Sequence, residues 1–321
     1  MKHRKLVILG TGGTIAGKAD NATDNIGYTA AQVGIEQLLE AIPALSASGL
    51  IISEQVSQID SKDMSFEVWA RLAARVRHFL ADDDVQGIVI THGTDTLEET
   101  AYFLQLTCQP TKPVVITCAM RPATALTPDG PQNVMDAVAV ARHPGACGVL
   151  AVCAGTVHSA LDVQKVHPYK LDAFSSGDAG PIGYVEEGQL RLLRNWPVRQ
   201  TGADYFAIEK ISSWPRVEIV MSYAGANALM VQALVSQGLR GLVVAGTGNG
   251  TVHEDLQAGL IDAQRAGVRV VRATRCLDGP ILPLSANAIE DSQGLSPVKA
   301  RIALMLALIN EEARYSTSKS A

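Results

Sequence analysis

The stretch KLVILGTGGTIAG, residues 5–17, joins a short apolar run to a loop rich in Gly and Thr. A second stretch of the same kind, GIVITHGTDT, occupies residues 87–96. A short apolar run that ends at glycines is typical of a buried parallel strand emerging into a loop. Open α/β sheets bind ligands beyond the carboxyl ends of such strands. We therefore expect the hydroxyls of Thr14 and Thr94 and the carboxylate of Asp95 to share one crevice suited to nucleophilic catalysis.

The first half of the chain alternates apolar runs with longer amphipathic stretches. We expect strands at residues 6–9, 50–56, 87–91, 114–117 and 148–152, and helices at 66–80 and 96–106. Thr96 and Glu99 have the spacing of a capping box at the start of the second helix. Asp95 would then lie in its first turn, where the helix dipole favours a negative charge. Strand–helix alternation predicts right-handed crossovers and a parallel sheet.

The pattern loosens from about residue 177 to 213, which we interpret as a β-turn segment followed by a linker. Alternation resumes with expected strands at 217–220, 241–245 and 268–273 and helices at 226–237, 256–266 and 297–310. The chain has 321 residues, more than the roughly 250–300 at which single cores usually split. We predict an α/β fold with a larger parallel-sheet N-terminal catalytic domain, a linker and a smaller C-terminal α/β domain, at residues 1–195, 196–213 and 214–321.

Composition excludes several classes of protein. The 27 basic and 32 acidic residues give a formal net charge of −5, and no basic patch suggests nucleic-acid binding. No segment approaches the ~20 apolar residues of a membrane span, so we expect a cytoplasmic protein, or a periplasmic one if a signal peptide was removed. The five cysteines form no Cys-x-x-Cys pair and are expected to be reduced and buried. The seven histidines lack the His-Glu-x-x-His spacing, so no metal is expected.

The loop after the first strand has two possible uses. It lacks the Gly-Lys-Ser/Thr ending of a P-loop, and helical periodicity resumes only near Val33, which argues against a phosphate cradle. Residues 17–29 are polar and rich in Gly, Asn and Asp, with Tyr28 near the end. Such a segment is a candidate active-site lid or an ordinary mobile loop.

Two further side chains, His92 and Lys165, are open to opposite interpretations. We expect His92 to be a packed, hydrogen-bonded structural residue rather than a base. Taken alone, Lys165 would be a solvated surface group. A desolvated neutral lysine can nevertheless remove a hydroxyl proton. With Thr94 and Asp95 it would then complete a set of nucleophile, base and orienting group.

These motifs together resemble bacterial L-asparaginases. The similarity includes GGTIAG from Gly12, HGTDTLEETAY from His92, AMRP from Ala119, DGPQN from Asp129 and AGTGNG from Ala245. It covers nearly the whole chain in order.

The resemblance implies hydrolysis of L-asparagine to aspartate and ammonia through an acyl-enzyme, without metal or organic cofactor. Thr14 corresponds to the nucleophile and Tyr28 to its activating partner. Thr94, Asp95 and Lys165 correspond to a second triad that activates the attacking water or, in another view, the nucleophile itself.

Further roles follow from the same resemblance. Ser61 would grip the substrate α-carboxylate, Asp95 the α-ammonium, and the backbone at Ala119 would lie by the scissile amide, with Asn249 also assigned to substrate binding. Family members are homotetramers built from close dimers, and the partner's smaller domain completes each site.

The chain departs from the family pattern at Lys62, where many periplasmic members have Gln, so we include Lys62 among the substrate-binding positions. A cation there would repel the substrate ammonium unless it turns outward or pairs with Asp60 or Asp63. We therefore expect weaker binding of the α-amino end than in relatives with Gln. The segment between Cys276 and Gly294 is also shorter than in periplasmic members, where it carries a glutamate donated to the neighbouring site.

Three alternatives remain beside an asparaginase. A relaxed glutaminase-asparaginase differs by one methylene of substrate, which changes discrimination by only ~1–3 kcal/mol. An archaeal tRNA-dependent amidotransferase subunit would carry an extra domain before the Gly/Thr-rich strand, which here begins almost at Met1. A non-enzymatic amino-acid-binding module would not need both threonines together with Asp95 and Lys165.

Overall fold

The computed structural model describes residues 4–197, 211, 213–282 and 289–319. The chain forms two compact units, Met1–Ala203 and Asp204–Ala321. Each unit has its own sheet. Most of the expected linker, residues 196–213, lies outside the described residues.

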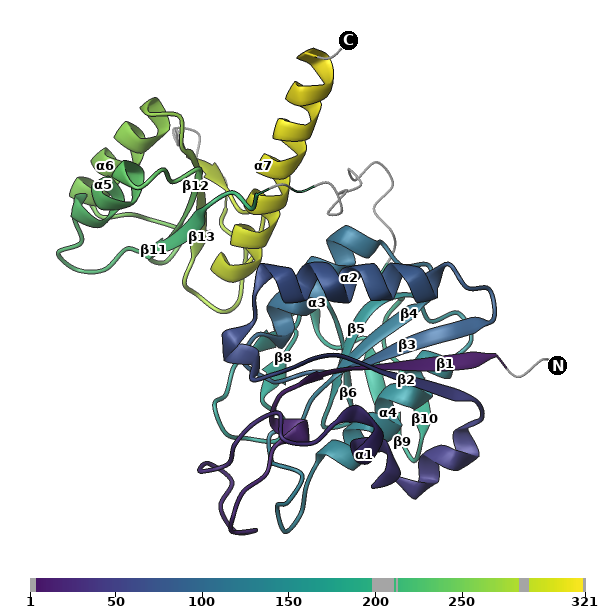
Figure 1. Ribbon diagram of the computed structural model, residues 1–321. Helices are drawn as coiled ribbons and strands as arrows, with labels where there is room; N and C mark the ends of the chain where they lie inside the picture. Colours follow the sequence, from purple (N-terminus) through teal and green to yellow (C-terminus); the bar gives the residue numbers. More distant parts are fainter. Residues whose placement is uncertain (1–3, 198–210, 212, 283–288, 320–321) are drawn as a thin grey trace. The chain divides into compact units, whose positions relative to one another are not determined.

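The larger unit is built around an eight-stranded sheet with the order β10-β9-β6-β5-β4-β3-β1-β2 (Figure 1). Five of its strands are parallel: β1 (Lys5–Gly12), β2 (Ile51–Ile59), β3 (Val85–Thr91), β4 (Pro113–Thr117) and β5 (Gly148–Cys153). All five expected strands are therefore present, each slightly longer than expected.

Three further strands make this sheet mixed rather than purely parallel. They are β6 (Thr156–Ser159), β9 (Gly183–Glu186) and β10 (Gln189–Leu192), each antiparallel to its neighbours. Two-residue turns join β5 to β6 and β9 to β10, and all four turn residues have positive φ. Such turns match the twist of a hairpin. The sequence signal was weak because these turns read Ala154-Gly155 and Glu187-Gly188 instead of Asn-Gly or Asp-Gly.

Helices cover both faces of the large sheet (Figure 1). On one face lie α2 (Phe66–Leu80), with the predicted bounds, and α3 (Leu97–Cys108), where Trp69 stacks on Phe103 at 4.7 Å between ring centroids. On the other face lie α1 (Ile35–Glu40) and α4 (Gly130–Arg142). The central strands β1, β3, β4 and β5 are buried on both sides, which explains why their sequences are largely apolar.

The strand order places a topological switch point between β1 and β3. From β1 the chain crosses to β2 on one side, whereas β3 lies on the other side of β1. Loops that leave neighbouring strands in opposite directions open a crevice at the carboxyl edge of a sheet. Thr14 follows β1 and Thr94 follows β3, so both lie at this switch point.

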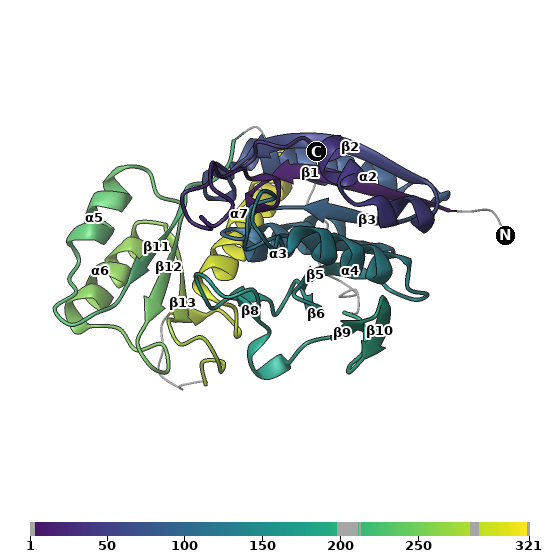
Figure 2. The ribbon, with the colours of Figure 1, turned by 90° about the horizontal axis from the view of Figure 1, so that it is seen from below.

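The smaller unit has a parallel sheet of β11 (Val217–Met221), β12 (Gly241–Gly246), β13 (Arg269–Thr274) and β14 (Glu290–Asp291). Its helices are α5 (Leu229–Ser236), α6 (Glu254–Arg265) and α7 (Pro297–Lys319). Figures 1 and 2 show α5 and α6 on one face of this sheet and α7 on the other. The strand β14 was not predicted, and α7 is longer than the expected 297–310. Among the described residues, no helix combines the length and the apolar character needed to cross a bilayer.

Candidate active site

The loops after β1 and β3 are in direct backbone contact. A Cβ added to Gly13 would lie 2.3 Å from the Cα of Gly93, and one added to Gly93 would lie 2.4 Å from the Oγ of Ser61. Gly13 also has a φ of 82°, which L side chains rarely adopt. Glycine at both positions is what allows the two threonine loops and the Ser61 segment to meet.

Thr14 is buried and bonded to the candidate lid. It begins a short 3-10 turn, Thr14–Ala16, and its Oγ1 lies 2.6 Å from the phenol oxygen of Tyr28. Backbone hydrogen bonds of 2.9 and 2.8 Å between Lys18 and Thr29 close the base of the intervening segment. Burial raises the pKa of Tyr28 above its ordinary value, so the phenol is neutral beside Thr14 at physiological pH.

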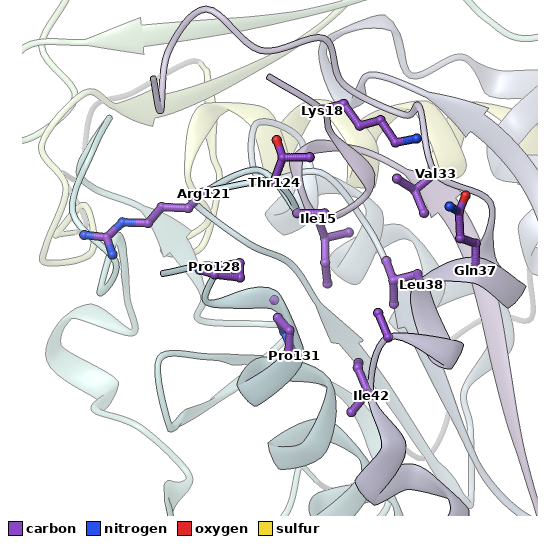
Figure 3. Close-up of a pocket in the computed structure, with 13 residues that line it drawn as sticks. Ile15, Lys18, Val33, Gln37, Leu38, Ile42, Arg121, Thr124, Pro128 and Pro131 are labelled. Carbon is purple, nitrogen blue, oxygen red and sulfur yellow. The ribbon is translucent and has the colours of Figure 1, made fainter. Parts of the chain in front are cut away.

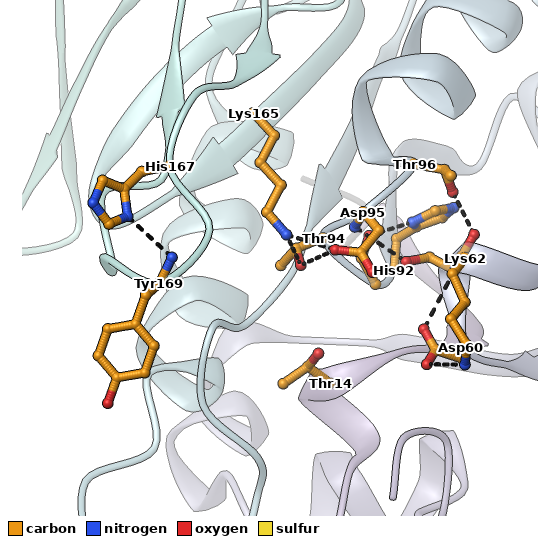
Figure 4. Close-up of polar contacts among 12 residues, drawn as sticks. Thr14, Asp60, Lys62, His92, Thr94, Asp95, Thr96, Lys165, His167 and Tyr169 are labelled. Atoms are coloured by element: carbon orange, nitrogen blue, oxygen red, sulfur yellow. Dashed lines mark hydrogen bonds and ion pairs between the residues drawn. The ribbon is translucent and has the colours of Figure 1, made fainter. Parts of the chain in front are cut away.

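Thr94, Asp95 and Lys165 form a compact cluster (Figure 4). The Lys165 amine donates to Thr94 Oγ1 at 2.9 Å and to Asp95 Oδ1 at 2.6 Å. The Thr94 hydroxyl also approaches Asp95 Oδ1 at 3.4 Å. Lys165 comes from the short strand β7 (Gln164–Lys165), which pairs with β8 (Phe174–Ser175). Its side chain is 17% exposed and that of Asp95 is 52% exposed, so the carboxylate is the accessible member.

The beginning of α3 differs from the expectation in two respects. The helix starts at Leu97 with Thr96 as its N-cap, which leaves Asp95 outside the first turn. The Thr96 hydroxyl does not cap the helix but donates to the carbonyl of Ser61 at 2.8 Å. The expected capping box is therefore absent, because Thr96 ties the Ser61 segment to the Thr94 loop.

Ser61 lies beneath this loop and is 2% exposed. Its Oγ accepts a hydrogen bond from the Asp95 backbone N–H at 3.1 Å. The structure thus brings Ser61 together with Thr94 and Asp95.

His92 is a packed structural residue, as predicted. It is fully buried, with Nδ1 2.7 Å from the carbonyl of Gly93 and Nε2 2.9 Å from Thr100 Oγ1. The Trp69 indole donates to the same Thr100 hydroxyl at 2.9 Å. Burial lowers the pKa of His92 to about 4, so the ring is neutral at physiological pH. The network anchors the Thr94 loop to α2 and α3.

Ala119 follows β4 and is held by two side chains whose individual roles the sequence did not reveal. The Asp129 carboxylate accepts from the backbone N–H groups of Met120 and Arg121, each at 2.9 Å. Asn133 donates to the Cys118 carbonyl at 2.9 Å and accepts from the Ala154 N–H at 3.0 Å. The only sequence signal was the presence of both residues in the DGPQN motif.

Lys62 does not stand alone. Its amine lies 2.7 Å from Asp60 Oδ2 and 3.4 Å from Asp63 Oδ2, and its side chain is 62% exposed (Figure 4). The sequence predicts that Lys62 repels the substrate ammonium unless it turns outward or pairs with Asp60 or Asp63. The structure shows this pairing. The structure therefore gives no ground for the weaker α-amino binding predicted from sequence.

Asn249 belongs to the smaller unit and is engaged there. Its side-chain amide donates to the Leu282 carbonyl at 3.1 Å and accepts from the Leu282 N–H at 2.7 Å. These two bonds give Asn249 a structural role in its own unit.

A separate pocket of about 210 Å³ is lined in part by Ile15, the residue after Thr14 (Figure 3). Its walls include the apolar side chains of Ile15, Val33, Leu38 and Ile42. Thr14, Thr94 and Lys165 do not line it. Among the described residues, no group of three or more His, Cys, Asp or Glu side chains is placed to hold a metal ion.

The fold and this geometry define an α/β enzyme with hydroxyl, amine and carboxylate groups gathered at the switch point of its larger sheet. Residues 5–198 match the family model described as asparaginase, N-terminal. Residues 216–318 match the model of the glutaminase/asparaginase C-terminal domain. The chain therefore belongs to the asparaginase/glutaminase family and is an amidohydrolase.

Individual relatives agree with this assignment. The chain is 40% identical to L-asparaginase 2 of Bacillus subtilis over 306 residues, which covers 94% of this chain and 81% of the relative. It is 40% identical to a glutaminase-asparaginase of Pseudomonas fluorescens over 315 residues, covering 96% and 87%. The crystal structure of a probable cytoplasmic L-asparaginase from Campylobacter jejuni superposes with a TM-score of 0.91 at 39% identity, covering 95% of both chains.

Proposed function

We propose that this enzyme hydrolyses L-asparagine to L-aspartate and ammonia through an acyl-enzyme on Thr14. The observation that carries the proposal is the direct contact between the loops of Thr14 and Thr94. That contact brings the Thr14 hydroxyl, which is hydrogen-bonded to the neutral phenol of Tyr28, near a second cluster. In this cluster the Lys165 amine binds the Thr94 hydroxyl and the Asp95 carboxylate. The family assignment and the names of the relatives support an amide as the substrate.

In the proposed first step, Thr14 Oγ1 bonds to the side-chain amide carbon of asparagine and the C–N bond breaks. The departing nitrogen takes up a proton and leaves as ammonia, and the hydroxyl proton of Thr14 is lost. The product is an aspartyl ester of Thr14. Tyr28 lies at hydrogen-bond distance from the attacking oxygen. Because its phenol is neutral, it can take the Thr14 proton only while it passes its own proton on, so we assign it as a proton relay.

In the second step, water adds to the ester carbon and the Thr14 oxygen leaves with a proton. We assign Thr94, Lys165 and Asp95 to activation of this water or of Thr14. In the resting arrangement Lys165 donates to Thr94. Lys165 must therefore give up a proton before it can accept one from Thr94.

Substrate binding is assigned to groups around the same loop. The half-exposed Asp95 carboxylate can accept the α-ammonium, and Ser61 lies beneath it to meet the α-carboxylate. The backbone at Ala119 would lie by the scissile amide, held by the bonds that Asp129 makes to Met120 and Arg121.

A relaxed glutaminase-asparaginase is the second candidate. A specific observation favours it, since the Pseudomonas fluorescens relative of that name is as similar to this chain as the Bacillus subtilis L-asparaginase. The substrates differ by one methylene, a difference that a binding site discriminates only modestly.

We also propose a homotetramer in the cytoplasm. Four large apolar side chains near β11 and α5 are each more than half exposed, namely Met221, Tyr223, Leu229 and Met230. Exposed apolar groups of this kind support a subunit interface on the smaller unit. The cytoplasmic assignment is supported by the name of the Campylobacter jejuni structure, whereas a Haemophilus influenzae relative is named periplasmic. Analytical ultracentrifugation and cell fractionation test the two proposals.

The function is tested by measuring ammonia release from asparagine and glutamine and comparing kcat/KM. We expect activity on asparagine that is lost in Thr14→Ala and partly retained in Thr14→Ser, which keeps the hydroxyl. Comparable kcat/KM for the two amides would favour the glutaminase-asparaginase. A wild type that releases no ammonia from either substrate would overturn the proposal.

A further inference from the structure

Two thiols lie side by side at the carboxyl ends of β4 and β5. Cys118 follows β4 directly and Cys153 is the last residue of β5. Their sulfur atoms are 3.0 Å apart, and the two residues are 1% and 3% exposed. Neither is bound in a disulfide, and the proposed catalytic steps use neither of them.

The strand register places the two cysteines opposite each other on adjacent strands. Thr117 pairs with Val152 in the parallel register, so Cys118 and Cys153 are the next residues along two adjacent strands. Neighbouring strands are about 4.8 Å apart, within the range of about 4.4–6.8 Å that a disulfide spans between Cα atoms. The sulfur atoms would need to approach by only about 1 Å to reach the disulfide length.

We propose that Cys118 and Cys153 are a site of reversible oxidation by hydrogen peroxide, which joins β4 and β5 through a disulfide. One thiol attacks the peroxide to give a sulfenic acid and water. The second thiol displaces hydroxide from that sulfur, forming the S–S bond and a second water. Two thiols are thereby oxidised, and one peroxide is reduced to two waters.

The burial of the pair determines which oxidant can reach it. A bulky disulfide such as oxidised glutathione cannot approach thiols that are almost completely covered, whereas peroxide is close to water in size. The hydrogen bond to Cys153 and burial raise the pKa of Cys118 well above its ordinary value. Because the thiolate is the reactive form, the oxidation is slow compared with that of an exposed thiol such as Cys276.

The pair is connected to the candidate active site through Asn133. This side chain donates to the carbonyl of Cys118 and accepts from the N–H of Ala154, the residue that follows Cys153. Ala119, assigned to the scissile amide, is the next residue after Cys118. A shift of about 1 Å in catalytic geometry can reduce a rate by about 100-fold. If the proposed role of Ala119 is right, the disulfide lowers kcat by about tenfold or more.

The test is peptide mapping of the full-length enzyme after peroxide treatment and alkylation of the remaining thiols under denaturing conditions. Trypsin does not cleave before proline, so Arg121-Pro122 and Lys112-Pro113 stay intact and Cys108 shares the 78–142 peptide with Cys118. Cys147 likewise shares the 143–165 peptide with Cys153. A Cys108→Ala/Cys147→Ala variant therefore makes the assignment unique.

We expect this variant to give one species linking the two peptides, with the loss of two hydrogen atoms and separation by dithiothreitol. The link should be absent from Cys118→Ser and from Cys153→Ser and retained in Cys276→Ser. Oxidised glutathione should not produce it in the folded enzyme. If both thiols remain alkylatable, or end as sulfinic acids without a link, the proposal is overturned. Because the link is read by mass, this result is independent of whether the enzyme hydrolyses asparagine.

Discussion

The hydroxyl oxygen of Thr14 lies 2.6 Å from the phenol oxygen of Tyr28, although the two residues begin and end a polar segment rich in turns. The Tyr28 ring also packs on the backbone, since a Cβ at Gly17 would lie 2.9 Å from its Cδ2. A segment that could have been an ordinary mobile loop thus delivers a polar group to the carboxyl edge of β1. The same segment is held at its base by the Lys18–Thr29 bridge.

Replacing Tyr28 with Phe should lower kcat for asparagine by about 100-fold, the size of effect expected for loss of a proton-transfer partner. The ring remains, so substrate affinity should change less than kcat. Steady-state ammonia release measures both parameters. Tyr184→Phe, which removes a phenol from β9, is the matched control and should behave as wild type. Equal activity of the two variants would remove Tyr28 from the mechanism.

Replacing Lys165 with Met removes the amine that binds both Thr94 and Asp95. We expect kcat/KM to fall by about 1,000-fold, within the range for loss of a general base. Lys170→Met alters an exposed lysine of the same segment and should leave activity unchanged.

The same Lys165→Met variant separates the two roles proposed for the Thr94 cluster. If the cluster activates water, an aspartyl ester on Thr14 should accumulate and be detected by intact-protein mass spectrometry. If it activates Thr14, no ester should form. Full activity in this variant would exclude both roles.

Replacing Lys62 with Gln should change KM for asparagine by no more than about twofold, because interactions between exposed charges contribute little free energy. Asp60 and Asp63 already balance the Lys62 charge. KM measured at low and high ionic strength tests this expectation. A tenfold decrease in KM at low salt would mean that the ammonium of Lys62 acts on the substrate after all.

His92 should make stability dependent on acid pH. Its pKa in the folded protein is about 4, against about 6.5 in an unfolded chain. The contribution is therefore complete above pH 6.5 and is lost as pH falls from about 6.5 to 4, where only the unfolded chain takes up the proton. The difference corresponds to roughly 3 kcal/mol.

Urea unfolding at equal protein concentration measures this effect. Between pH 7.5 and pH 4 the wild type should lose roughly 3 kcal/mol more than His92→Asn. An identical loss in both proteins would show that His92 does not titrate in this way.

Sequence reasoning was most successful where the signal is local. The apolar runs predicted β1 to β5, and helical spacing predicted α2 with its observed bounds. It was less successful at β6, β9 and β10, whose hairpin turns lack the usual Asn-Gly or Asp-Gly. The capping box failed for a different reason, because a tertiary partner, the Ser61 carbonyl, competes for the Thr96 hydroxyl.

The amino-acid sequence by itself determined the α/β class, the threonine loops at the ends of two strands and the burial of His92, because apolar periodicity and glycine positions are local properties. Only the tertiary structure decided that Lys165 reaches Thr94 across 71 residues and that Cys118 meets Cys153. Those contacts depend on strand order and register, which are established when distant segments pack together. No window of neighbouring residues carries that information.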